Sequence, residues 1–355
     1  MKIDDVLKEA VRRQASDVIL SAGAPITYHV FGELHQDAPP VPLQAEQTRE
    51  LVYQFLGPAQ RKEFEEVQEL DMGFELDGLA RFRASVFRQR GTVAAVLRLI
   101  PLEIPHYSRI GMPESLLRSL LTIPNGLVLV TGPTGSGKST TVASYLEYLN
   151  TEHGVPKHVV TIEDPIEFPL KSKVCVINQR EIGVDTRGYA AGLRSALRQM
   201  PNIIFVGEMR DRETIEIALT AAETGNVVIS TLSTQSASKT IHRIIDVFPI
   251  QDQAEIRTRL ALTLKAVISQ VLLRRKDGKG RIAAREILLS SGSVSNLIRE
   301  GKVHQINNVI ASSRNEGMVL LDDTLLELYH EGVLYAADVL PRLQDPEKAR
   351  FLSTA

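Results

Sequence analysis

The sequence predicts an α/β protein, in which a core with a mostly parallel sheet follows a smaller α+β domain. Two observations favour this core: short apolar segments alternate with amphipathic segments from residue 126 to 231, and a glycine-rich loop joins the first apolar segment to a helix. Apolar strands separated by helices are typical of a parallel sheet covered on both faces. The length of 355 residues supports two domains, because one domain usually takes about 100 to 200 residues.

The first hundred residues predict the α+β domain. Charged and apolar residues recur at helical spacing over 3–15, whereas Ile26, Tyr28 and Val30 alternate with polar residues as in a strand. We therefore expect an N-terminal domain over 1–100 with an antiparallel sheet. In order, its expected elements are a helix over 3–15, strands over 17–20 and 26–34, a helix over 45–67 that breaks at Gly57 and Pro58, and strands over 71–75, 79–88 and 92–100.

Residues 101–113 are expected to link the two domains, because they contain three prolines, a glycine and scattered polar residues. The second domain is expected over 114–355. Its predicted strands lie at 126–130, 158–162, 174–178, 203–206 and 227–231, and its predicted helices at 138–150, 189–199 and 212–223. The last hundred residues predict a helical C-terminal extension, because helical spacing relates residues such as Leu260, Leu264, Val267, Ile268 and Val271.

The glycine-rich loop has the pattern of a phosphate-binding loop. Its glycines let backbone N–H groups surround the α- and β-phosphates, Lys138 reaches the β- and γ-phosphates, and the Ser139 hydroxyl can ligate Mg²⁺. Apolar residues after Lys138 recur at helical spacing, so the positive end of a helix dipole faces the phosphates. The sequence therefore predicts a nucleoside triphosphate site. Its expected positions are Gly132, Pro133, Thr134, Gly135, Ser136, Gly137, Lys138, Ser139 and Thr140.

Two acidic segments follow predicted strands of the core. Glu163 and Asp164 come after the strand over 158–162, and Glu208 follows the strand over 203–206. The carboxyl ends of parallel strands line one crevice, so both segments are expected to face the γ-phosphate. Hydrolysis needs a metal site and a group that activates water, and one acid can serve each need. Each segment alone is more typical of a solvated strand end, but their combination with the loop favours catalysis.

Arginines of the first domain offer positive charge for the same reaction. Arg83, Arg88 and Arg90 are spaced along a predicted strand and its end. They are either solvated charges of a sheet edge or donors that reach the phosphates and stabilise transition-state charge, as an arginine finger does. The residue pattern leaves both interpretations open.

The charge and cysteine counts exclude several classes of function. Lys and Arg number 41 against 43 Asp and Glu, and the net charge of −2 argues against broad binding of duplex nucleic acid. The single cysteine, Cys175, excludes an internal disulfide and a four-cysteine zinc site, and it fits a reducing cytoplasm. The N-terminus lacks the apolar stretch of an export signal, and no run of about 18 apolar residues predicts a membrane span.

With these motifs, the chain resembles the retraction-motor ATPases of type IV pili, within the wider secretion ATPase superfamily. The resemblance depends on the loop and on residues 161–167 and 206–211, and it runs nearly end to end. It implies a cytoplasmic motor, peripheral at the inner membrane, in which hydrolysis of ATP with Mg²⁺ drives pilus retraction and twitching motility. It also implies a homohexamer of PAS-like N-terminal and RecA-like ATPase domains. Its implied partners are an inner-membrane pilus platform protein and a sister retraction ATPase.

The resemblance also implies residue roles. Glu163 is the expected catalytic base, and Glu208 and Ser139 belong to the metal site. By the same resemblance, Arg83, Arg88 and Arg90 are candidate phosphate sensors.

Among the departures from the family pattern, two concern histidines. Asn226 and Ser233 stand where the family has two histidines, and neither carries positive charge. Asn226 could still donate to a phosphate or a carboxylate, whereas the shorter Ser233 is expected to need a bridging water. These departures leave a second hypothesis, a nucleotide-gated accessory subunit that binds ATP and a sister motor but hydrolyses little. A nucleic-acid translocase is a third, because RecA-like cores also move DNA.

Overall fold

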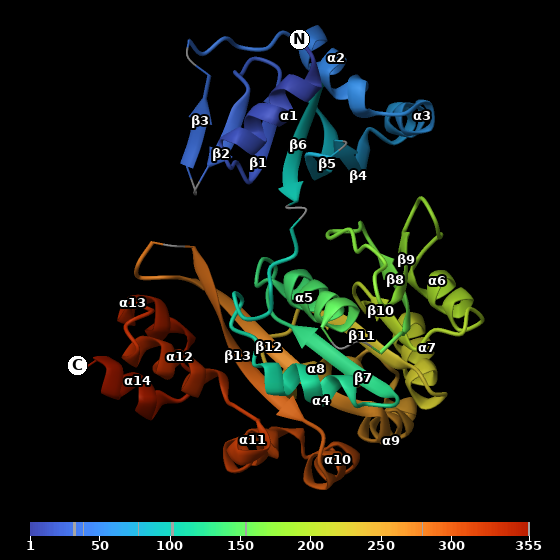
Figure 1. Ribbon diagram of the computed structural model, residues 1–355, viewed down its shortest axis with the longest axis vertical. Helices are drawn as coiled ribbons and strands as arrows, with labels where there is room; N and C mark the ends of the chain where they lie inside the picture. The colour runs from blue at the N-terminus through green and yellow to red at the C-terminus, as the bar shows by residue number, and fades with distance from the viewer. Residues whose placement is uncertain are drawn as a thin grey trace. The chain divides into compact units, whose positions relative to one another are not determined.

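The computed structural model describes residues 1–30, 33–37, 39–76, 78–100, 103–152, 155–278 and 280–353 (Figure 1). The chain forms two compact units: Met1–Glu103 with Pro165–Pro169, and Ile104–Asp164 with Leu170–Ala355. Within the expected linker 101–113, residues 101 and 102 lie outside the described residues, and the part from Ile104 belongs to the second unit. Residues 31 and 32 of the strand expected over 26–34 also lie outside them.

The first unit contains an antiparallel sheet and helices, as the periodicity predicts. Its large core side chains include Tyr28, Phe64 and Phe82, all buried. The strand order is β3-β2-β1-β6-β5-β4. The elements are α1 (Ile3–Arg12), β1 (Asp17–Ser21), β2 (Thr27–Val30), β3 (Glu33–Gln36), α2 (Ala45–Phe55), α3 (Pro58–Val67), β4 (Glu69–Leu76), β5 (Ala80–Gln89) and β6 (Thr92–Ile100).

The second unit is built on a mostly parallel sheet, which confirms the predicted α/β fold. The strand order is β13-β12-β7-β11-β10-β8-β9, and the edge strand β13 runs antiparallel to β12. The strands are β7 (Gly126–Thr131), β8 (His158–Glu163), β9 (Val176–Glu181), β10 (Ile203–Val206), β11 (Val227–Leu232), β12 (Leu264–Arg274) and β13 (Arg281–Leu289). Helix α4 (Glu114–Leu121) precedes β7, and the helices between the strands are α5 (Lys138–Thr151), α6 (Tyr189–Ala196), α7 (Arg212–Glu223), α8 (Ala237–Asp246) and α9 (Gln253–Thr263).

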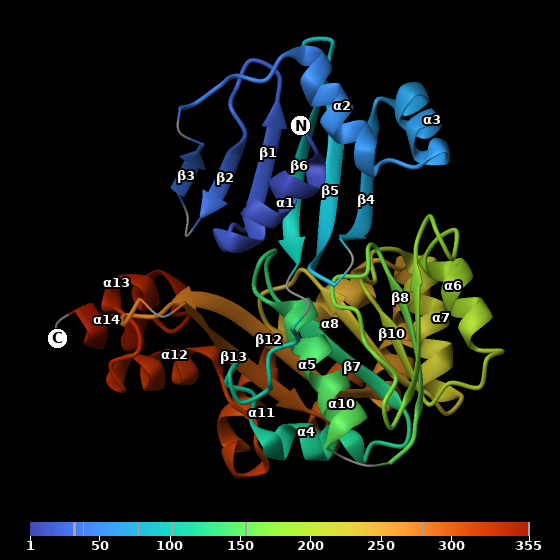
Figure 2. The same cartoon turned by 45° about the horizontal axis from the view of Figure 1, so that its top comes forward.

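Strand β7 shows why the core strands are apolar throughout. Successive side chains of a strand point to opposite faces, and here both faces are covered. Leu127 and Leu129 pack into the core beside α7 and α9, whereas Val128 and Val130 pack into the core beside α4 and α5. Figure 2 shows α5 against the sheet near β7.

The periodicity of Leu260 to Val271 predicts a helix, and this prediction is wrong for most of these residues. Residues from Leu264 form the long strand β12, which pairs with β7 on one side and with β13 on the other. Its residues from Ala266 to Gln270 are buried. A strand buried on both faces is a continuous apolar run, and periodicity cannot distinguish such a run from a buried helix.

The expected helical extension begins only after β13. It contains α10 (Gly292–Arg299), α11 (Ile306–Ser312), α12 (Leu321–His330), α13 (Ala336–Val339) and α14 (Pro346–Ser353). Figures 1 and 2 show α12, α13 and α14 gathered beside β13. Leu325 and Leu334 of this part are buried against Leu273 and Ala284 of the β12–β13 pair.

Candidate active site

The glycine-rich loop connects the end of β7 to the start of α5. Gly132 and Gly137 have φ angles of +147° and +86°, in the region that glycine adopts most readily. Gly132 also has no room for a side chain: a Cβ atom there would lie 2.2 Å from the carbonyl oxygen of Gln270 and 2.5 Å from Ser136 Oγ. The tight path of the loop therefore requires these glycines.

Polar groups of the loop are arranged to receive an anion. Lys138 Nζ donates to the carbonyl oxygens of Gly132 at 2.9 Å and Pro133 at 3.1 Å. Ser136 is buried, and its Oγ has no hydrogen-bond partner among the described residues, although buried polar atoms are nearly always paired. Helix α5 begins at Lys138, so the positive end of its dipole faces the loop. An orphaned donor, a cation and a helix N-terminus together fit a phosphate chain.

The other predicted loop positions differ in exposure. Pro133, Thr134 and Gly135 are exposed, whereas Ser139 and Thr140 lie half-buried in the first turn of α5. A ligand thus has access to the loop from solvent at residues 133–135.

Gln270 of β12 supports the loop through hydrogen bonds of its side chain. Its side chain is buried, its Nε2 donates to the Ser136 carbonyl at 2.7 Å, and its Oε1 accepts from Thr141 Oγ1 at 2.9 Å. The amide therefore joins the loop to the first turns of α5. The sequence analysis missed this residue, although an amide within the apolar run of residues 264–273 was a usable signal.

We expect Gln270→Leu to weaken ATP binding about tenfold, because the buried Ser136 carbonyl loses its donor and the loop loses its support. Nucleotide titration followed by fluorescence measures the effect. Gln251→Leu, at an exposed glutamine, is the matched control and should bind like the unchanged protein. Equal affinities for all three proteins would show that the loop keeps its shape without Gln270.

Glu163 ends β8 and is only 8% exposed. Its Oε1 accepts from Thr161 Oγ1 at 2.6 Å and from Gln179 Nε2 at 3.0 Å. Two donors on one oxygen fix the orientation of the carboxylate. Glu163 is therefore held in place by β8 and its neighbour β9.

Glu208 lies just after β10 and has two partners. Its Oε2 pairs with Arg210 Nη2 at 2.7 Å, and its Oε1 accepts from Ser233 Oγ at 3.2 Å. For a carboxylate, the expectation that Ser233 needs a bridging water is wrong, because the hydroxyl reaches Glu208 directly. Ser233 follows β11, which lies between β10 and β7.

Both acids lie at the carboxyl ends of parallel strands, on the same side of the sheet as the loop. Strands β7, β11, β10 and β8 are neighbours in that order, and all are parallel. A spacing of about 4.8 Å between strands puts the end of β10 about 10 Å, and the end of β8 about 15 Å, from the end of β7. Glu208 is thus the nearer acid and Glu163 the more distant one.

Tyr189 places a hydroxyl between these strand ends. A Cβ atom on Gly207 would lie 3.1 Å from Tyr189 Oη, so the ring packs against the turn that precedes Glu208. Burial raises the pKa of the Tyr189 phenol, and the nearby Asp164 carboxylate raises it further. The hydroxyl therefore stays protonated at neutral pH and is a hydrogen-bond donor at the acidic edge. The sequence analysis treated Tyr189 only as the start of a helix.

The arginines of the first unit do not lie on a sheet edge. Strand β5 lies between β4 and β6, so the interpretation of Arg83 and Arg88 as edge-strand charges is wrong. Arg88 Nη2 pairs with Glu65 Oε2 at 2.5 Å. Arg90 is exposed, in the turn after β5, with a φ angle of +49°.

Asn226 lies at the other end of the parallel strands from the loop. It precedes β11, its Nδ2 donates to the Pro201 carbonyl at 2.7 Å, and its own carbonyl accepts from Gly126 at the start of β7. The six residues of β11 extend about 20 Å. The expectation that Asn226 donates to a phosphate or to an acid of this site is therefore wrong for its own chain.

The described residues contain neither a membrane-spanning helix nor a cluster of metal-ligating side chains. None of the helices in the described ranges has the length and apolar character needed to cross a membrane. In the same ranges, no three His, Cys, Asp or Glu side chains gather as a ready metal site. A Mg²⁺ ion held by one or two protein oxygens, substrate phosphates and water needs no such cluster.

Comparisons with known proteins agree with this geometry. A family model described as "Type II/IV secretion system protein" matches residues 1–332. The chain is 46% identical to the type IV pilus retractation ATPase PilT of Pseudomonas aeruginosa over 98% of this chain and 99% of that protein. It is 36% identical to the type IV pilus ATPase PilU of the same organism over 99% and 91% of the two chains. The crystal structure of the pilus retraction motor PilT with bound ADP matches with a TM-score of 0.90 and 43% identity, over 99% of each chain.

Proposed function

The chain belongs to the type II/IV secretion system protein family, and we propose that it is the ATP-hydrolysing motor that retracts type IV pili and so drives twitching motility. The proposal depends mainly on one observation. The phosphate-binding loop, Glu163 and Glu208 all lie at the carboxyl ends of parallel strands of one sheet. The near full-length similarity to a named retraction ATPase supports the biological role.

ATP is the proposed substrate of the loop. Backbone N–H groups of residues 134–137 and the Lys138 ammonium would bind its phosphates, and the buried Ser136 hydroxyl would gain an acceptor. Ser139 and Glu208 are the residues that would hold Mg²⁺, which neutralises charge on the β- and γ-phosphate oxygens when it is bound. The related PilT structure has bound ADP, which supports a nucleotide as the ligand of this chain.

Glu163 is the proposed general base. Thr161 and Gln179 hold its carboxylate in one orientation, so that it can take a proton from a water molecule as that water attacks the γ-phosphorus. The bond from the γ-phosphorus to the bridging oxygen then breaks, and ADP and phosphate leave. The tyrosine hydroxyl of residue 189 stays protonated beside these acids, where it can donate to a carboxylate or to water.

Pilus retraction requires an assembly around this site. We propose a homohexamer of a PAS-like domain over 1–100 and a RecA-like domain over 114–355, at the cytoplasmic face of the inner membrane. Its proposed partners are the pilus platform protein and a sister retraction ATPase, as the existence of both PilT and PilU in one organism suggests. Positive charge for the transition state would come from Arg83, Arg88 and Arg90.

The test combines hydrolysis with motility. The purified full-length protein should hydrolyse ATP only with Mg²⁺, with the mass of a hexamer in solution. Cells that lack the protein should keep surface pili but lose twitching. A protein that binds ATP, stays inactive in every oligomeric form and is dispensable for twitching would contradict the proposal.

The accessory-subunit alternative is favoured by one contact, that of Ser233 with Glu208. We expect Ser233→His to raise kcat about fivefold, because an imidazole N–H extends further toward a bound phosphate than a hydroxyl does. Asn226→His is the matched control and should leave kcat within about twofold, since it lies at the opposite end of β11. Steady-state ATPase assays of the single variants measure both effects. A low kcat of the unchanged protein that Ser233→His raises supports the accessory role. A larger change in kcat from Asn226→His contradicts the placement of Asn226 away from the site.

A further inference from the structure

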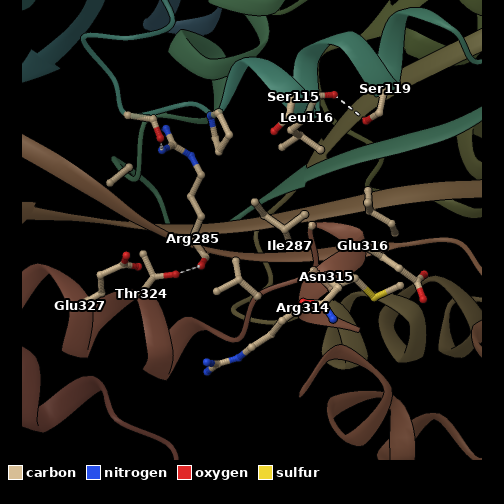
Figure 3. Close-up of a pocket in the computed structure, with 17 residues that line it drawn as sticks. Ser115, Leu116, Ser119, Arg285, Ile287, Arg314, Asn315, Glu316, Thr324 and Glu327 are labelled. Carbon is tan, nitrogen blue, oxygen red and sulfur yellow. Dashed lines mark hydrogen bonds between the residues drawn. The ribbon is translucent and has the colours of Figure 1, made fainter. Parts of the chain in front are cut away.

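A cavity of about 650 Å³ lies on one face of β13 and is lined by residues outside the phosphate-binding loop. Helix α4, the segment 314–319 and helix α12 surround it. Figure 3 shows Ser115 and Leu116 of α4 on one side of the strand and Thr324 and Glu327 of α12 on another. Its volume falls within the range of small-molecule pockets.

Arg285 brings a buried positive charge into the wall of this cavity. The side chain extends from β13 toward the segment before α4 (Figure 3) and is only 4% exposed. Its Nη1 donates to the Gly111 carbonyl at 2.9 Å, whereas its Nε and Nη2 are buried without a partner among the described residues. Burial lowers the pKa of Arg285 to about 10, so the guanidinium is still charged at neutral pH. A buried charge without a counter-ion is strongly unfavourable.

The two unpartnered nitrogens define the chemistry of the missing partner. On a planar guanidinium, the N–H groups of Nε and Nη2 lie along one edge and point the same way. A carboxylate accepts from such an edge through both of its oxygens, which is the strongest geometry available to arginine. The Gly111 carbonyl occupies only the other nitrogen. Both unpartnered nitrogens are covered in this structure, so a carboxylate can accept from this edge side-on once it displaces the atoms that cover them.

The remaining walls favour a ligand with an apolar body. Leu116, Ile287 and Met318 line the cavity, and each is at most 6% exposed. Apolar walls with a few placed polar groups are typical of sites for small organic molecules. An inorganic ion would leave these walls without contacts.

The surroundings of the cavity limit the charge of the ligand. Glu316 and Glu327 line it and are exposed, and the charge of Arg314 is already paired with Asp323. Arg285 and Arg314 balance Glu316 and Glu327, so the lining has no excess of positive charge for a polyanion such as a nucleotide. A ligand with one negative charge and an apolar body meets all of these conditions.

We propose that this cavity is a binding site for an apolar monocarboxylate, whose carboxylate is held by the Nε and Nη2 edge of Arg285. The site is separate from the one proposed for ATP, and it exists whether or not the protein is a motor. Arg285 lies directly opposite Gln270 in the β12–β13 pair, so the carboxylate would bind one strand away from the residue that supports the phosphate-binding loop.

Octanoate is a suitable probe, and isothermal titration calorimetry of the full-length protein, saturated with Mg²⁺ and ADP, measures its binding. We expect one saturable site per chain for octanoate and at least about tenfold weaker binding of octanol and octylamine, which lack the carboxylate. Arg285→Lys keeps the charge but loses the pair of parallel N–H donors, so we expect it to bind octanoate about tenfold more weakly. Arg281→Lys, at an exposed arginine of the same strand, should bind octanoate like the unchanged protein.

Ser115→Trp tests the same site without touching Arg285. Ser115 is exposed and lines the cavity, so a tryptophan there should block the cavity while the protein stays folded. Loss of octanoate binding in this variant supports the proposal. Binding that survives both Arg285→Lys and Ser115→Trp would place octanoate on another surface and overturn it, and so would the absence of saturable binding up to about 10 mM.

Discussion

Glu163→Gln is expected to lower kcat by about 10²- to 10⁴-fold and to leave ATP affinity nearly unchanged, because an amide cannot take a proton from water. The substitution keeps the shape of the side chain. Its carbonyl oxygen can still accept from Thr161 and Gln179, as the Glu163 carboxylate does. The loss would therefore come from the missing base and not from a displaced side chain.

Steady-state hydrolysis and nucleotide titration of the same samples separate the two effects. Glu213→Gln, at an exposed carboxylate that pairs with Arg194 on the surface, is a matched control that should keep full activity. If Glu163→Gln hydrolyses ATP at the normal rate, the base is another group at this edge. Glu208 would be the next candidate, although its pairing with Arg210 makes it less available for a proton.

The phosphate-binding loop and the positions of the acids could be predicted because each depends on neighbours in the sequence. The apolar strand before the loop, the glycines within it and the helix after it form one local unit. The acids follow because every parallel strand ends at the same edge of its sheet. No knowledge of distant contacts is needed for either inference.

Strand β12 could not be predicted in the same way. Its residues from Ala266 to Gln270 are buried, and the reason is the pairing of β12 with both β7 and β13. Leu264, Val267, Ile268 and Val271 happen to stand at helical spacing, so the local pattern favoured a helix. Tertiary pairing overrides such a pattern.

The support of the loop by Gln270 is likewise a long-range property. The hydrogen bond from Gln270 to Ser136 joins residues 134 positions apart. The two positions that lack the histidines of the family differ in their contacts for a similar reason. Asn226 and Ser233 are close in sequence, but they stand at opposite ends of β11, and only Ser233 contacts an acid of the site.

Lys138→Ala is expected to weaken ATP binding by about 10²-fold or more, and hydrolysis at ordinary ATP concentrations should be lost with it. The Lys138 ammonium lies against the carbonyl oxygens of Gly132 and Pro133, at the mouth of the loop. A bound triphosphate would replace neutral carbonyl partners with charged phosphate oxygens. Charge-assisted hydrogen bonds of this kind contribute about 1.5 to 3 kcal/mol each, so two of them account for the expected loss.

The same substitution separates binding from catalysis when it is compared with Glu163→Gln. Lys138→Ala should fail to bind nucleotide, whereas Glu163→Gln should bind it and fail to turn it over. Thr134→Ala, at an exposed position of the loop, controls for a general disturbance and should bind ATP within about threefold of the unchanged protein. If Lys138→Ala binds ATP as tightly as Thr134→Ala, the triphosphate does not occupy this loop. The roles of Glu163 and Glu208 would then lose their basis, because both depend on a γ-phosphate at this edge of the sheet.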